Sequence, residues 1–109
     1  MAWLILFVAG LFEVLWAYSL KQSQGFTRVL PAVITLGAML ASFGLLGYAM
    51  KTIPLGTAYP IWTGIGAVGT FIIGFTLLNE TITPLRVVAA LLIASGIVLM
   101  KLSTPVAAP

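Results

Sequence analysis

The first twenty residues, Met1 to Leu20, read MAWLILFVAGLFEVLWAYSL and contain a single charged side chain, Glu13. About 20 apolar residues are enough to cross a bilayer as an α-helix. A carboxylate inside such a span costs between about 3 and more than 10 kcal/mol, so it persists mainly where it handles a proton, an ion or a charged substrate. This stretch therefore predicts a membrane fold and a functional position within it.

The composition of the whole chain agrees with a membrane protein. Of its 109 residues, 61% are hydrophobic and 6% are charged, and the mean hydropathy is +1.20; soluble domains have about 25% charged residues. Cysteine and histidine are absent, which removes disulfides, thiol chemistry and the usual zinc or haem ligands, so we expect no metal and no cofactor. The net charge of +3 comes without a basic run. It indicates helix-end anchors and no nucleic-acid partner.

Four apolar spans divide the chain. They cover residues 1–20, 29–50, 55–78 and 84–102. The last begins at Thr83-Pro84, an N-cap residue followed by proline at the first helical position. We expect an all-α membrane protein, with one four-helix domain over residues 1–104 and a disordered tail over residues 105–109. The N-terminus lacks the basic region and cleavage site of a signal peptide, so we expect the first span to be retained.

Positive charges are almost evenly divided between the two ends of these spans. Two lie on the side of the termini and three on the other: Lys51 and Lys101 against Lys21, Arg28 and Arg86. Because positive charge normally sets orientation, this balance favours insertion both ways round, with one fixed topology as the alternative. Two opposed copies would reproduce the inverted repeats of larger transporters, whose site lies at the midplane. The expected assembly is an antiparallel, dual-topology homodimer.

Small residues on the last two spans are candidates for close helix contact. Ala89 and Gly96 lie seven residues apart on the fourth span, and we expect them to contact the second copy; packing within one subunit is the alternative. Gly64 and Gly66 follow Pro60 on the third span. Together these three residues indicate a hinge in mid-membrane, and close packing is again the alternative.

Polar and aromatic side chains on three spans could surround Glu13. Trp16 lies one helical turn after it, and Tyr59 and Trp62 share a face of the third span. Ser42 adds a hydroxyl from the second span. A carboxylate supplies charge, aromatic rings supply cation–π attraction, and hydroxyls would orient the carboxylate by hydrogen bonds. These residues indicate a site for an organic cation, with ordinary aromatic packing as the alternative for the two tryptophans.

Three segments form a specific combination: FEVLWA at 12–17, GFTR at 25–28 followed by Pro31, and GTAYPIWTGIG at 56–66. They resemble the small multidrug resistance family of proton-coupled exporters, and the similarity covers residues 1–104. Within that family, five residues resemble the guanidinium-exporter subtype: Trp16, Ala17, Gly10, Met39 and Lys101. The quaternary-ammonium subtype usually lacks the tryptophan.

The resemblance implies an antiparallel homodimer in the bacterial inner membrane. By alternating access, it would exchange cytoplasmic guanidinium, or singly substituted guanidines such as guanylurea, for protons. Glu13 would bind both the substrate and the proton, with Trp16, Ser42, Tyr59 and Trp62 around it. Pro60 departs from the subtype, which usually has a small residue there. Since proline removes a backbone donor and can kink a helix, this position bears on substrate breadth.

Other functions remain open at this point. A quaternary-ammonium multidrug exporter would take cations that donate no hydrogen bonds, and a channel would pass ions without exchange. A structural membrane subunit would tolerate Glu13→Gln. An enzyme is the least expected class, because the mid-membrane groups include no pair of nucleophile and base.

Overall fold

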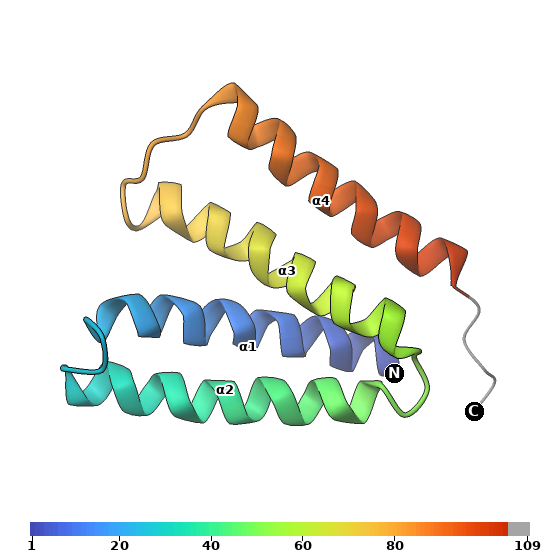
Figure 1. Ribbon diagram of the computed structural model, residues 1–109, viewed down its shortest axis with the longest axis horizontal. Coiled ribbons are helices and arrows are strands. Elements are labelled where there is room, and N and C mark those ends of the chain that lie inside the picture. The colour runs from blue at the N-terminus through green and yellow to red at the C-terminus, as the bar shows by residue number, and fades with distance from the viewer. Residues whose placement is uncertain (105–109) are drawn as a thin grey trace.

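The computed structural model describes residues 1–104, which form four helices and no strand (Figure 1). The helices are α1 (Ala2–Gln22), α2 (Val29–Ala49), α3 (Leu55–Thr76) and α4 (Pro84–Ser103). All four are long and apolar enough to cross a membrane, which confirms the predicted all-α fold with four membrane-spanning helices. Each helix begins and ends within two residues of its expected span. The tail predicted for residues 105–109 lies outside the described residues.

Short polar signals set the helix ends. The hydroxyl of Thr83 accepts a hydrogen bond from the N–H of Arg86 at 3.1 Å, which caps α4 ahead of Pro84. Between α1 and α2, the hydroxyl of Ser23 donates to the carbonyl of Leu20 at 2.7 Å and accepts from the N–H of Phe26 at 3.1 Å. These bonds hold a tight link that reverses the chain.

The four helices form a flat layer in the order α2, α1, α3, α4 (Figure 1). The layer measures 45 × 34 × 17 Å, and its smallest dimension is less than two helix diameters, since one helix with its side chains is about 10–12 Å wide. Within residues 1–104, α4 packs its backbone against α3 only, and none of its residues is buried. One subunit therefore leaves most of α4 for lipid or another helix to cover.

The buried core lies at the end of the layer where α1 begins and α2 ends. There α2 also reaches α3, so three helices meet. The core residues are Leu6, Ala9, Leu46, Ala49, Ile53, Ala58, Ile61 and Trp62. Burial of these side chains fixes α1, α2 and α3 as one unit, to which α4 is attached through α3.

Glycines bring α3 close to both of its neighbours. A Cβ atom at Gly10 of α1 would lie 2.5 Å from Cγ2 of Ile65, and one at Gly64 would lie 2.9 Å from Cγ1 of Ile97 on α4. Only glycine fits at these two contacts without a shift of the facing isoleucine. The helix α3 continues without a break through Pro60. Close packing is thus an observed role of Gly64, and its role as a hinge stays a prediction.

Candidate functional site

Glu13 lies midway along α1 and faces α3. Its carboxylate contacts the backbone of α3 at Gly66, where any Cβ atom would overlap the carboxylate. The side chain as a whole is half-buried, and its Oε1 atom is buried with no hydrogen-bond partner within residues 1–104. An unpaired buried carboxylate oxygen is costly. Binding of a proton or a cation to this carboxylate therefore lowers its free energy.

Four aromatic rings from the first three helices form a continuous series, here called the aromatic row: Trp16, Phe43, Trp62 and Tyr59. Successive ring centroids are 6.5, 5.8 and 5.5 Å apart, within the range of favourable aromatic pairs. Trp62 is buried, whereas 52% of the Tyr59 surface is exposed. Phe43 is also exposed, so the row has its buried ring, Trp62, between two exposed ones and offers ring faces to a cation at the surface of the subunit.

Ser42 fixes the middle of the aromatic row. Its buried hydroxyl donates to the carbonyl of Ala9 at 2.7 Å and accepts from Nε1 of Trp62 at 2.9 Å. In a helix, the carbonyl of Ala9 also pairs with the N–H four residues later, that of Glu13. The expectation that the Ser42 hydroxyl orients the carboxylate directly is wrong for this subunit. Its single proton is already donated to α1, and it acts by positioning Trp62.

Trp16 carries a second unpaired polar atom. Its Nε1 is buried and has no acceptor within the described part of the chain. Trp16 and Glu13 are three residues apart, so an unpaired donor and an unpaired acceptor lie on one turn of α1. Such a pair could bind a ligand, or groups of a second copy, that offers both a donor and an acceptor.

Trp16, Ser42, Tyr59 and Trp62 lie next to one another through direct contacts and through Phe43, which was not predicted from the sequence. That they surround the Glu13 carboxylate stays a prediction. Phe43 is one of six phenylalanines in an apolar chain, and its position after Ser42 was the only available signal. The contact of Gly66 with Glu13 was also missed, because a spacing argument does not reveal which helix faces a glycine.

The two predicted dimer contacts lie on exposed parts of α4. Gly96 borders a groove of about 200 Å³ between α3 and α4 that Pro60 also lines, and a Cβ atom there would meet nothing within 4 Å. Ala89 borders a smaller groove of about 140 Å³ near Arg86. Both residues have room for another helix, and their contact with a second copy stays a prediction.

Replacing Ser42 with alanine is expected to lower the free energy of unfolding by about 1–3 kcal/mol, because it leaves the buried Nε1 of Trp62 without an acceptor. The measurement is thermal unfolding of the detergent-purified protein. Ser103→Ala is the matched control, since that hydroxyl is exposed and bonds only within the last turn of α4. Equal unfolding temperatures for the two variants would contradict the role assigned to Ser42.

Comparisons with known proteins agree with this architecture. Residues 1–93 match the family model described as Small Multidrug Resistance protein. The chain is 54% identical to the guanidinium exporter of Escherichia coli (strain K12), and 52% identical to those of Citrobacter freundii and Salmonella typhimurium. Each similarity extends over 104 residues, which are 95% of this chain and 99% of the relative. These relatives are named as exporters and not as enzymes. The resemblance seen in the sequence is confirmed, and the chain belongs to the small multidrug resistance family.

Proposed function

We propose that this protein is a proton-coupled antiporter of the bacterial inner membrane that exports guanidinium and singly substituted guanidines such as guanylurea. The observation that carries the proposal is the Oε1 atom of Glu13, which is buried in a membrane-spanning helix without a hydrogen-bond partner. Relatives named as guanidinium exporters, at 52–54% identity over most of the chain, support the substrate.

The chemistry of the site suits a flat cation that donates hydrogen bonds. Guanidinium presents paired N–H donors in one plane, which match the oxygens of a carboxylate such as Glu13. Its planar face can also stack on aromatic rings, and Trp16 and the rest of the aromatic row supply such faces. Ser42 holds Trp62 in one orientation, so the receiving surface is preorganised.

Coupled exchange follows when protons and substrate use the same acceptor. No side chain of residues 1–104 donates to Oε1 of Glu13, so this oxygen has no hydrogen-bond donor until a proton or a cation binds. A proton occupies the oxygens that the guanidinium N–H groups need, and the cation in turn excludes the proton. Each ligand therefore leaves when the other replaces it.

An antiparallel homodimer would supply the alternating access. A flat subunit 17 Å thick cannot by itself surround a cation, whereas two layers facing each other can. The near balance of positive charge, with Lys51 and Lys101 opposite Lys21, Arg28 and Arg86, supports insertion in both orientations. In such a pair, the inward-open and outward-open states are the same structure inverted. They have similar energies, so the gradients of protons and substrate set the direction of exchange.

The test is exchange by the purified protein in liposomes. An imposed proton gradient is expected to drive guanidinium and guanylurea uphill, and a guanidinium gradient is expected to move protons the opposite way, as read by a pH-sensitive dye. Transport of tetraalkylammonium ions but not guanidinium would instead identify a quaternary-ammonium exporter. Guanidinium flux without proton movement would contradict exchange and indicate a channel.

A further inference from the structure

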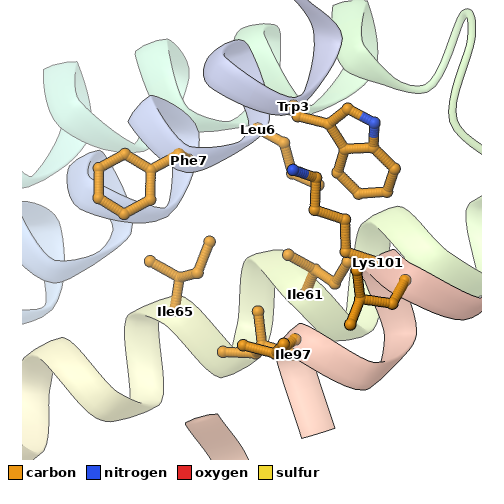
Figure 2. A pocket seen from close by; sticks show the side chains of 9 residues that line it. Trp3, Leu6, Phe7, Ile61, Ile65, Ile97 and Lys101 are labelled. Atoms are coloured by element: carbon orange, nitrogen blue, oxygen red, sulfur yellow. The ribbon is translucent and has the colours of Figure 1, made fainter. Parts of the chain in front are cut away.

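A groove of about 380 Å³ lies between α1, α3 and α4, at the end of the layer where α1 begins and α4 ends (Figure 2). Its volume is within the range of ligand sites, about 300–1,000 Å³. Eight of its nine lining residues are apolar or aromatic, and the ninth is Lys101. The side chain of Lys101 extends from α4 towards α1, and its Nζ atom lies 5.5 Å from the ring centroid of Trp3 (Figure 2). The groove thus combines apolar walls with one ammonium group.

This groove is distinct from the candidate cation site. Phe7 lines the groove and Trp16 begins the aromatic row; nine residues separate them on α1, which places them about 180° apart around the helix. On α3, Ile61 of the groove and Tyr59 of the row are two residues apart and so point about 160° from each other. The lining residues of the groove include neither Glu13 nor any member of the aromatic row. Leu6 of the groove and Glu13 share a face of α1, but their seven-residue separation places them about 10 Å apart along the helix.

The positions of the lining residues match the depth profile of a lipid. Trp3 lies in the first turn of α1 and Lys101 in the last turn of α4, the level at which tryptophan and lysine contact lipid headgroups. Phe7 and Ile97 each lie four residues further into the span, which is about 6 Å deeper. The Lys101 ammonium group lies at headgroup level, where it could pair with a lipid phosphate. The apolar wall below it could contact the acyl chain.

The charge at this end of the layer favours a negative headgroup. The charged side chains at this end, Lys51 and Lys101, are both positive, whereas the opposite end carries the acidic Glu80 beside three basic residues, Lys21, Arg28 and Arg86. Basic residues close to a membrane surface attract anionic lipids. We propose that this groove binds an anionic phospholipid, with an acyl chain along its apolar walls and the phosphate paired with Lys101.

The first experiment is native mass spectrometry of the detergent-purified protein with added phosphatidylglycerol or phosphatidylcholine. We expect phosphatidylglycerol to bind more tightly, and Lys101→Gln to weaken its binding about fivefold. Lys51→Gln is the matched control, because it removes the same charge at the same end but outside the groove, where Lys51 lies over Tyr48. Equal losses in the two variants would show a general surface attraction and overturn the proposal, as would equal affinity for the two lipids.

A second measurement locates the lipid. In the variant Trp16→Phe/Trp62→Phe, Trp3 is the remaining tryptophan, and its fluorescence reports on the groove. Phosphatidylglycerol with brominated acyl chains is expected to quench Trp3 more strongly than brominated phosphatidylcholine at the same mole fraction, and Lys101→Gln is expected to remove the difference. Failure of both lipids to quench Trp3 would mean that another occupant, such as the second copy, covers the groove. Both measurements read lipid binding alone, so their outcome is separate from that of the exchange assay.

Discussion

Glu13→Gln is expected to reduce guanidinium–proton exchange to the rate of protein-free liposomes. Glutamine keeps the size and shape that fit against Gly66, but it carries no negative charge and does not exchange a proton. Both halves of the transport cycle would be lost, because the cation has no counter-charge and the return step has no proton carrier. Since the contacts of the side chain are retained, the variant is expected to fold and to elute from a sizing column like the unchanged protein.

Glu80→Gln is the matched control for this substitution. Glu80 is the other carboxylate of the chain, and it is exposed in the link between α3 and α4, where its backbone N–H donates to the carbonyl of Gly74 at 2.9 Å. Removal of its charge leaves that backbone bond intact. We expect near-normal exchange from this variant.

A binding experiment tests whether guanidinium and protons compete for Glu13. In weakly buffered solution, addition of guanidinium to the unchanged protein is expected to release protons, since cation and proton compete for the same oxygens. Glu13→Gln should release none and bind no guanidinium. Exchange by Glu13→Gln at a rate comparable to that of Glu80→Gln would refute the proposed mechanism.

The membrane fold could be predicted from sequence because its determinants are local. A run of about 20 apolar residues must become a helix in lipid, where every backbone polar group needs an internal partner, and prolines and polar links mark the ends. The arrangement of the helices could not be predicted in the same way. Helices that are apolar all round, as α2 is between Val29 and Ala49, carry no stripe to show which face meets which neighbour.

The composition of the candidate site was predictable for a related reason. A lone carboxylate, hydroxyls and tryptophans are conspicuous in an apolar span, so Glu13, Ser42 and Trp62 could be selected before their geometry was known. Their hydrogen-bond partners could not be predicted. The bonds from Ser42 to Ala9 and Trp62 depend on how α1, α2 and α3 approach one another, and an alanine carbonyl gives no signal in sequence.

The contact between Glu13 and Gly66 leads to the second large expected effect. Gly66→Ala is expected to weaken guanidinium binding about 10- to 100-fold, because the added Cβ atom overlaps the carboxylate and displaces it from its place against α3. Loss of one charge-assisted hydrogen bond of about 1.5–3 kcal/mol corresponds to a change of this size. The measurement is the guanidinium concentration that gives half-maximal exchange, supported by direct binding to the purified protein.

Stability and transport should change in opposite directions in this variant, which distinguishes displacement of the carboxylate from general damage. Alanine is favoured over glycine inside a helix by about 1 kcal/mol, and the flexible carboxylate can rotate away, so Gly66→Ala is expected to unfold at the same or a higher temperature. Gly37→Ala provides the control, because a Cβ atom there meets nothing within 4 Å and brings the helical preference without the overlap. Normal guanidinium affinity in Gly66→Ala would mean that the carboxylate does not need this contact. Lower thermal stability together with lower affinity would mean that the glycine serves helix packing alone.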